Sequence, residues 1–312
     1  MEGSWTRRLA VLVALATITA PCARWANLPL GTTKRQLVVA GVTRTYLLRA
    51  GGEGRPGRAL VLVLHGLGGT GAAIERRTRG TFDRLADRDG AVIVYPDSLG
   101  EPHRWNDGWP VGPPGASQPD DIGFLSALVG SVVAELGVDR KRVFAAGLSN
   151  GAGMVYRIAC ERPDLVAAVA AVAGGMAPAV AIACPHGTPV SIIAMHGTED
   201  SVVPLDRGIR QDIATWVKRD GCTGSPTSSQ LPDVDPLDRT RTRVDVVGSC
   251  NSDTEVAFYT IEGGGHAWPG GNEPLQSALR PGHAPNDFDA GVLIWDFFQK
   301  HPRAVIEMRR PP

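Results

Sequence analysis

One motif, the run from Val143 to Met154, constrains the fold of this chain more than any other feature. It is an apolar strand pattern that passes through Gly147-Leu-Ser-Asn-Gly151 into a helical pattern. In a G-x-S-x-G turn the serine has a strained backbone, and glycine on either side leaves room for it. The motif therefore predicts a nucleophile elbow, which lifts the Ser149 hydroxyl out of a sheet and beside the free N–H groups of a helix N-terminus.

A serine nucleophile needs a base and an acid that orients the base, and in this kind of fold they follow in the order serine, acid, histidine. The buried-strand pattern of residues 190–195 opens into a turn-rich loop that carries Asp200, and the alternating pattern of 255–261 opens into a glycine-rich loop that carries His266. Each candidate follows the C-terminal end of a strand, where open α/β sheets place their sites. Ser149, Asp200 and His266 are therefore the predicted catalytic set.

Two other acidic residues compete with Asp200. Glu199 is its neighbour, and Asp206 lies six residues further along the same loop. Asp206 fits better at the start of the helix that follows, where a short acidic side chain can cap free N–H groups. Asp200 is therefore preferred as the acid.

His266 is one of seven histidines, of which His65 and His196 also end strand patterns and are interpreted as packing residues. No His-Glu-x-x-His or paired Cys/His spacing accompanies His266. The glycine run at 66–69 lacks the Lys-Ser/Thr ending of a phosphate-binding loop. We therefore expect neither a metal nor a cofactor.

Strand and helix patterns alternate along the chain, which is the signature of an α/β fold with a mostly parallel sheet and helices on both faces. Expected elements are a hairpin over 36–49, strands at 59–64 and 92–95, a helix capped by Asp121 and a final helix near 286–299. The Ala/Val-rich segment 162–180 is compatible with helix or strand.

After the strand that ends at Leu64, the backbone N–H of Leu67 is the natural partner of that of Asn150 in an oxyanion hole.

Five segments together resemble a known family of secreted bacterial esterases, the polyhydroxybutyrate-depolymerase-like and feruloyl-esterase-like proteins, some of which are envelope lipoproteins. The segments are Arg104–Gly108, Asp120–Leu125, Gly147–Ala152, His196–Pro204 and Gly263–Gly271. The resemblance covers about residues 34 to 300, and ordered motifs make it more specific than the elbow alone.

The resemblance implies an α/β-hydrolase fold and two-step acyl transfer by Ser149, His266 and Asp200. Polyesters of short hydroxy acids, feruloylated or acetylated polysaccharides and small soluble esters all remain open as substrates. A catalytically silent envelope protein that keeps the fold for binding is the alternative, although the intact catalytic set disfavours it.

Trp105, Trp109 and Trp268 lie in loops among these motifs. Flat aromatic faces suit sugar rings and aromatic acids, so these side chains are candidates for the lining of a substrate cleft. The alternative is that Trp105 and Trp268 are structural plugs beneath the loops.

Residues 1–26 resemble a signal peptide, because Arg7 and Arg8 precede an apolar stretch too short to span a bilayer. Cys22 stands where a lipid-anchored cysteine would be, but Pro21 fits lipoprotein processing poorly, and ordinary secretion is slightly favoured. Residues 27–312 then form one catalytic domain, with a loose tail from about 302. The chain has 32 basic and 32 acidic residues and no basic patch, so nucleic acid is not an expected partner.

Four cysteines remain once Cys22 is set aside, and an exported protein is expected to pair them. Four cysteines allow three connectivities, and the sequence alone does not settle which one forms. Proximity and the family resemblance favour Cys160 with Cys184 and Cys222 with Cys250.

Overall fold

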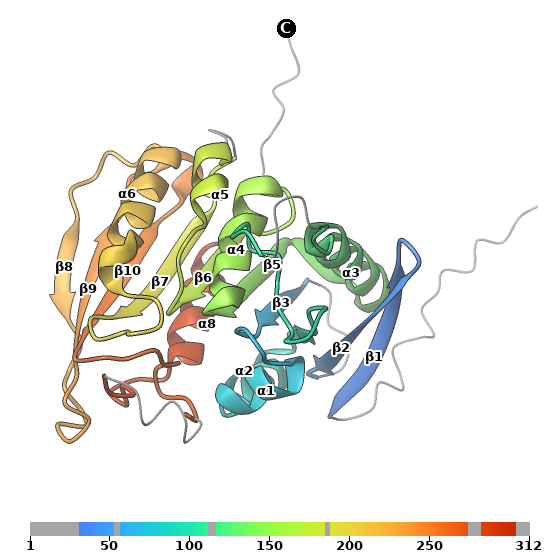
Figure 1. Cartoon of the computed structure of the whole chain (residues 1–312), viewed down its shortest axis with the longest axis horizontal. Coiled ribbons are helices and arrows are strands. Elements are labelled where there is room, and N and C mark those ends of the chain that lie inside the picture. Colours follow the sequence, from blue (N-terminus) through green and yellow to red (C-terminus); the bar gives the residue numbers. More distant parts are fainter. Residues whose placement is uncertain (1–30, 53–56, 112–116, 185–187, 274–281, 304–312) are drawn as a thin grey trace, which may run out of the picture.

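A single sheet organises the protein. The computed structural model describes residues 31–52, 57–111, 117–184, 188–273 and 282–303, and ten strands within these ranges are ordered β1-β2-β4-β3-β5-β6-β7-β10-β9-β8. Figure 1 shows the sheet extending from β1 at one end of the molecule to β8 at the other. The strands are β1 (Thr32–Val39), β2 (Val42–Ala50), β3 (Arg58–Leu64), β4 (Val92–Pro96), β5 (Val138–Leu148), β6 (Ala168–Val172), β7 (Ser191–Gly197), β8 (Thr227–Gln230), β9 (Arg241–Val247) and β10 (Val256–Glu262).

The middle of the sheet is parallel. Strands β4, β3, β5, β6, β7 and β10 run in one direction, and antiparallel pairings add β2 and β1 at one end and β9 and β8 at the other. Every residue of β3, β4, β6 and β7 is buried, as expected for strands covered on both faces. The predicted mostly parallel sheet is confirmed.

Helices cover both faces of the sheet and separate two apolar cores. One core joins the sheet to α3 (Asp121–Leu136), α4 (Asn150–Glu161), α5 (Pro178–Ala183) and α6 (Ile209–Arg219). The other joins it to α1 (Gly71–Arg77), α2 (Thr81–Asp89) and α8 (Ala290–Lys300). Two single turns of 3₁₀ helix, η1 (Leu205–Arg207) and η2 (Asn251–Asp253), complete the described helices.

The parallel strands end at the same edge of the sheet. Leu148, the last residue of β5, is in register with Val172 of β6, which is in turn in register with Met195 of β7. On the other side of β7, Ile261 of β10 is in register with Gly197. The loops that follow β5, β7 and β10 therefore leave the sheet side by side, and these loops carry the predicted catalytic residues.

The undecided segment 162–180 contains both kinds of structure. Residues Ala168–Val172 form β6 in the middle of the sheet, and Pro178 begins α5 at a position where its missing N–H has no cost. The sequence pattern cannot separate strand from helix here, because the two periodicities look alike when every residue is apolar. In the structure the Ala/Val stretch is a strand because it is buried on both faces of the sheet.

Two predicted helix caps are wrong. Asp120, and not Asp121, caps α3, since its carboxylate accepts a hydrogen bond from the N–H of Gly123 at 2.8 Å. Asp121 is buried and pairs with Arg44 of β2 at 2.7 Å. Asp206 is exposed in η1, and α6 begins after Gly208 without a side-chain cap. The sequence does not show which carboxylate meets a partner from another element.

Two disulfides close the loops that proximity and the resemblance favour. Cys160 at the end of α4 is joined to Cys184 after α5, and Cys222 after α6 is joined to Cys250 after β9. The second bond closes the segment that contains β8 and β9. Residues 1–26 and Cys22 lie outside the described residues, as does the tail beyond Arg303.

Candidate active site

Ser149 occupies the turn between β5 and α4 in a strained conformation. Its φ of 57° and ψ of −117° are rarely adopted by a residue with a side chain. The flanking glycines are required by close backbone contacts. A Cβ atom on Gly147 would lie 2.2 Å from the carbonyl oxygen of Gly151, and one on Gly151 would lie 2.6 Å from that of His65. The G-x-S-x-G motif therefore forms the elbow that its spacing predicts.

Asp200 and His266 come together from neighbouring strands. Asp200 follows β7, His266 follows β10, and Nδ1 of His266 lies 2.8 Å from Oδ2 of Asp200. The second oxygen, Oδ1, accepts hydrogen bonds from the backbone N–H groups of Val202 and Val203 at 2.9 and 2.8 Å. Because an ionised carboxylate only accepts, His266 carries its proton on Nδ1 and leaves Nε2 free to take another.

The surroundings of Asp200 favour its charged form. Burial alone would raise its pKa, but the hydrogen bond and charge of His266, together with the N–H of Val203, lower the pKa below its ordinary value. The side chain of Asp200 is inaccessible to solvent, and that of His266 is 12% exposed. Glu199 is exposed, and among the described contacts no interaction joins it or Asp206 to His266. Only Asp200, of the three acidic candidates, reaches the histidine.

The serine hydroxyl lies at the same sheet edge, but among the described residues it makes no hydrogen bond to His266. Such a contact is often long before a substrate is bound and shortens in the reacting complex. The loop after β3 lies against the serine, since a Cβ on Gly66 would be 3.3 Å from Cβ of Ser149. The backbone N–H groups of Leu67 and Asn150 have no acceptor within the described part of the chain. Neither N–H group is therefore committed to an acceptor there.

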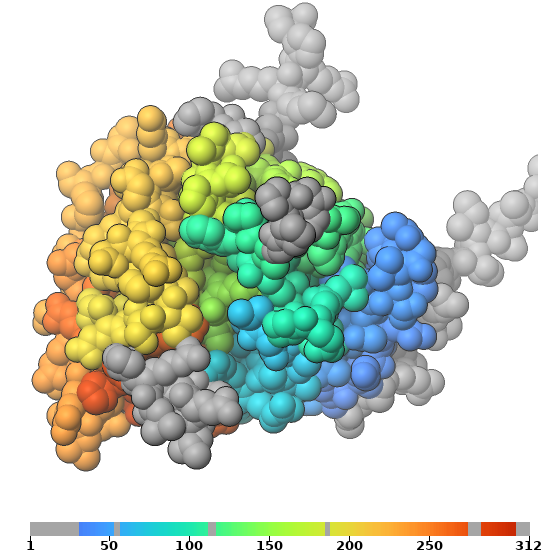
Figure 2. All heavy atoms as spheres, in the orientation of Figure 1, coloured from blue at the N-terminus to red at the C-terminus, as the bar shows by residue number. Residues whose placement is uncertain are grey.

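A cavity of about 280 Å³ opens beside Ser149. Its walls come from the loop after β3, from residues 104–109, from the segment after β6 and from residues 202–212. The second and fourth of these segments both reach the face shown in Figure 2, where they are blue-green and yellow. Most of the lining is apolar, including Met176 and Ile209, which suits the organic part of an ester.

The three candidate tryptophans have different environments. Trp109 is 45% exposed and lines the cavity. Trp105 and Trp268 are buried and are absent from the cavity wall, which agrees with the alternative that they support the loops from below. The indole N–H of Trp105 donates to the carbonyl oxygen of His65 at 3.0 Å. Burial of this kind depends on which loop covers which, so the sequence pattern left both interpretations of Trp105 and Trp268 open.

The structure also brings Asp212 into the cavity, which the sequence reasoning missed. Its Oδ2 accepts a hydrogen bond from the N–H of Met176 at 2.8 Å, while Oδ1 has no partner among the described residues. Burial raises the pKa of Asp212 to about 6, although the N–H of Met176 opposes this. In the sequence Asp212 is an ordinary polar residue of an amphipathic helix, and no local signal marks it.

His65 and His196 pack where their strands end, as interpreted from the sequence. His65 accepts a hydrogen bond from the N–H of Ser98 through Nε2, and burial lowers its pKa. His196 contacts the carbonyl oxygen of Val203 at 2.7 Å and lies 3.5 Å from Oδ2 of Asp200, so it packs against the acid.

The ranges that the structure describes contain no cluster of three His, Cys, Asp or Glu side chains that could hold a metal ion. No helix in the same ranges is long and apolar enough to cross a membrane.

Comparison with known proteins supports the resemblance drawn from the motifs. Residues 46–195 match the family model described as esterase PHB depolymerase. NocK of Nocardia uniformis subsp. tsuyamanensis, whose name marks it as a candidate esterase, is 33% identical over 275 residues, or 80% of this chain and 77% of NocK. Feruloyl esterase C of Emericella nidulans is 30% identical and feruloyl esterase B of Piromyces equi 28% identical. These matches cover 67% and 63% of this chain, and 64% and 38% of those enzymes.

Solved structures share the fold. An acetyl xylan esterase from Aspergillus awamori superposes with a TM-score of 0.61 at 16% identity, over 86% of this chain and 99% of that one. A thermostable esterase gives a TM-score of 0.58 at 14% identity, over 87% of this chain and 63% of the other. With its mostly parallel sheet, its serine elbow and these relatives, the chain belongs to the esterase PHB depolymerase family and is a carboxylic ester hydrolase of the α/β-hydrolase fold.

Proposed function

We propose that the chain hydrolyses esters by two-step acyl transfer, with Ser149 as nucleophile, His266 as general base and Asp200 as the acid that orients the base. The observation that carries this proposal is the 2.8 Å hydrogen bond between His266 and Asp200, formed at the sheet edge where the elbow presents Ser149. Serine, histidine and aspartate with these contacts are the groups that serine hydrolases use, whatever their order in the chain.

Each step assigns a proton to a stated atom. Nε2 of His266 takes the Ser149 proton as the hydroxyl oxygen attacks the ester carbonyl, and the same proton then passes to the departing alcohol. Water attacks the acyl-enzyme in turn, with Nε2 again as the base. The N–H groups of Leu67 and Asn150 stabilise the oxyanion in both steps, a contribution of about 3 to 4 kcal/mol for each donor.

The cavity supports esters of aromatic hydroxy acids as the substrate class. Trp109 offers a half-exposed aromatic face, Met176 and Ile209 an apolar wall, and Oδ1 of Asp212 an unpaired acceptor. A phenolic hydroxyl that donates to Asp212 would satisfy an acceptor that is otherwise costly to enclose. Some relatives are named feruloyl esterase, which is consistent with this choice, while the family model and one solved structure carry the names of a polyester depolymerase and an acetyl xylan esterase.

Export is the second part of the proposal. Two disulfides are typical of proteins that leave the reducing cytoplasm, and they account for four of the five cysteines. Cys22 is then the only cysteine left over, which agrees with its removal together with a signal peptide of residues 1–26. We therefore propose a secreted catalytic domain of residues 27–312. Mass measurement of the exported protein tests this, because a retained, lipid-modified Cys22 would contradict it.

The nucleophile is tested by labelling with a fluorophosphonate and by hydrolysis of p-nitrophenyl butyrate. Ser149→Ala should abolish labelling and lower kcat by up to about a millionfold, as in other serine hydrolases. His266→Ala should cost nearly as much, and the double variant little more, because the two groups act as a unit. Ser201→Ala, which changes an exposed serine beside Asp200, is the control. Normal turnover by Ser149→Ala would refute the mechanism.

The substrate class is tested with a pair of esters that differ only at the phenol. Methyl ferulate should have a higher kcat/KM than methyl 3,4-dimethoxycinnamate, and Asp212→Asn should reduce the ratio. A buried hydrogen bond to a charged acceptor is worth roughly 1.5 to 3 kcal/mol, or about ten- to a hundredfold. Asp206→Asn, an exposed change just before the same helix, is the control. An unchanged ratio in Asp212→Asn would remove Asp212 from the substrate site.

A further inference from the structure

We propose that Trp105 is a positioning residue that joins the two chain segments whose N–H groups form the oxyanion hole. The inference rests on the proposed function, and it assigns a role to the motif Arg104–Gly108, which the catalytic set leaves unused. One donor, Leu67, belongs to the loop after β3, and the other, Asn150, begins α4. These segments are far apart in the sequence and need a connection that holds their N–H groups at a common spacing.

Trp105 binds the side chain of Asn150 through its backbone. The N–H of Trp105 donates to Oδ1 of Asn150 at 2.8 Å, and Nδ2 of Asn150 donates to the carbonyl oxygen of Trp105 at 3.1 Å. The second hydrogen of Nδ2 is donated to Oδ2 of Asp107 at 2.7 Å. With its oxygen and both amide hydrogens engaged, the Asn150 side chain has one orientation that satisfies all three partners.

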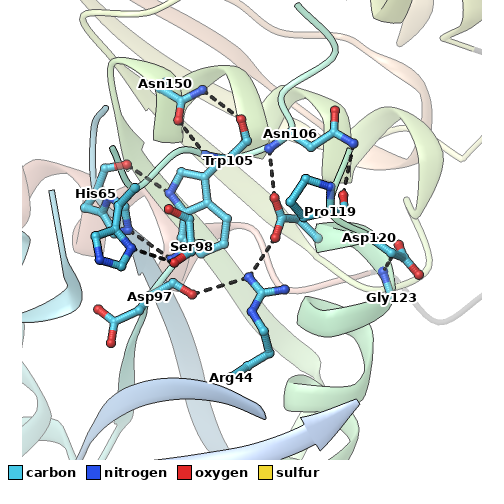
Figure 3. Close-up of polar contacts among 12 residues, drawn as sticks. Arg44, His65, Asp97, Ser98, Trp105, Asn106, Pro119, Asp120, Gly123 and Asn150 are labelled. Carbon is cyan, nitrogen blue, oxygen red and sulfur yellow. Dashed lines mark hydrogen bonds and ion pairs between the residues drawn. The ribbon is translucent and has the colours of Figure 1, made fainter. Parts of the chain in front are cut away.

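The indole ring of Trp105 binds the other segment. Its Nε1–H donates to the carbonyl oxygen of His65 at 3.0 Å, two residues before Leu67. Figure 3 shows the indole between His65 and the Asn150 side chain. The imidazole of His65 also fixes the loop after β3, because it bonds to Ser98 after β4 and to Gly66. Since its Nε2 accepts from the N–H of Ser98, its Nδ1 carries the proton and donates to the carbonyl oxygen of Gly66 at 2.7 Å. Trp105 is fully buried, so its bond to His65 is shielded from water.

A buried ion pair holds the residue that follows Trp105. Asp121 at the start of α3 accepts from Nη2 of Arg44 at 2.7 Å through Oδ1, and from the N–H of Asn106 at 2.8 Å through Oδ2. Arg44 and Asn106 are labelled in Figure 3. The side chains of Arg44 and Asp121 are 3% and 0% exposed. Nδ2 of Asn106 also donates to the carbonyl oxygen of Pro119 at 3.0 Å. The loop that carries Trp105 is thereby fixed to β2 and α3, so it can act as a rigid support.

Rigid support matters because an oxyanion hole acts only on the transition state. Its donors must lie about 2.7 to 3.1 Å from the developing oxyanion, and a misplacement of about 1 Å costs on the order of a hundredfold in rate. Loosening the connection between Leu67 and Asn150 should therefore lower kcat and leave KM nearly unchanged. By contrast, replacing a residue that only fills the core would lower the stability and leave both kcat and KM nearly unchanged.

The test compares two tryptophans with matched environments. Trp105→Phe keeps a flat ring but removes the N–H that binds His65. Trp216→Phe is the control, because Trp216 is also fully buried and its Nε1–H donates to a backbone carbonyl oxygen, that of Val190, at 2.8 Å before β7 begins. Both variants should lose similar stability. Only Trp105→Phe should lose kcat, by about ten- to a hundredfold at nearly constant KM, and it should bind a boronic acid transition-state analogue more weakly by the same factor.

Asn150→Ala tests the connection from its other end and decides the question if Trp105→Phe does not fold. It keeps the backbone N–H of residue 150 and should show the same loss of kcat, with less than additive losses when combined with Trp105→Phe. Equal kcat values for Trp105→Phe and Trp216→Phe, or normal kcat in Asn150→Ala, would overturn the inference. If Ser149→Ala is inactive while these variants are normal, only the positioning role fails. If Ser149→Ala is active, the proposed function fails.

Discussion

Replacing Asp200 by asparagine changes one atom of the site, and the structure indicates how the amide would lie. Oδ1 of Asp200 accepts from two backbone N–H groups, those of Val202 and Val203, and Oδ2 accepts from His266. An amide oxygen can keep the two backbone bonds only if its NH₂ group faces His266. The reversed orientation would turn the NH₂ group toward these two backbone N–H groups and lose both hydrogen bonds, each worth about 0.5 to 1.5 kcal/mol.

The amide therefore donates where the carboxylate accepted. Nδ1 of His266 must then become an acceptor and its proton moves to Nε2, the atom that has to receive the serine proton. The charge that stabilises the imidazolium is lost as well. The same change in the chymotrypsin-type template lowers kcat about ten-thousandfold. That factor corresponds to about 5.5 kcal/mol of transition-state free energy at about 1.4 kcal/mol per tenfold.

The assay is kcat for p-nitrophenyl butyrate, measured beside the melting temperature of each variant. Asp200→Asn should lose about four orders of magnitude in kcat while it remains folded. Glu199→Gln is the matched control, since it makes the same chemical change at the exposed neighbouring residue and should keep normal activity. The reasoning is refuted if Asp200→Asn keeps more than about a tenth of the activity, or if Glu199→Gln loses as much.

Three further predictions concern stability. Burial raises the pKa of Asp212 to about 6, so its contribution to stability is present at low pH and is lost as the pH rises through that value. Asp212→Asn should therefore gain stability relative to the wild type between about pH 4 and about pH 7 in melting curves, and a constant difference would contradict this. Gly147→Ala should prevent folding or cost more than about 4 kcal/mol, because its Cβ would lie 2.2 Å from a carbonyl oxygen. Gly130→Ala, with no atom within 4 Å, should be tolerated in urea titrations. Replacing both Cys160 and Cys184 by serine should lower the free energy of unfolding by roughly 3 kcal/mol, since their separation is 24 residues, and an unchanged urea midpoint would be inconsistent with that bond.

Much of the site could be predicted from the sequence because its requirements are local. The sharp turn at Ser149, with φ 57°, leaves room only for glycine on either side, so five residues are enough to predict the elbow. Asp200 and His266 were predicted because each lies just beyond a strand, and parallel strands end at one edge of a sheet. Their positions relative to the strands were enough to predict that they meet. The register of β7 and β10 then brings Nδ1 of His266 to 2.8 Å from Oδ2 of Asp200.

Tertiary structure alone decided the roles of residues whose environment comes from elsewhere in the chain. Asp120 and Asp121 are adjacent and chemically identical. Asp121 forms a buried ion pair with Arg44 from β2, whereas Asp120 caps the helix. Trp105 and Trp109 stand in one short segment, but only the second reaches the cavity.

Asp212 gives the sharpest contrast. It has the sequence signature of a surface helix residue, and it lines the cavity because α6 packs beside the segment after β6, where its carboxylate binds Met176. Backbone conformation is dictated by near neighbours and can be read from a motif. Burial and hydrogen-bond partners depend on elements distant in the chain, so they are determined only when the whole sheet has assembled.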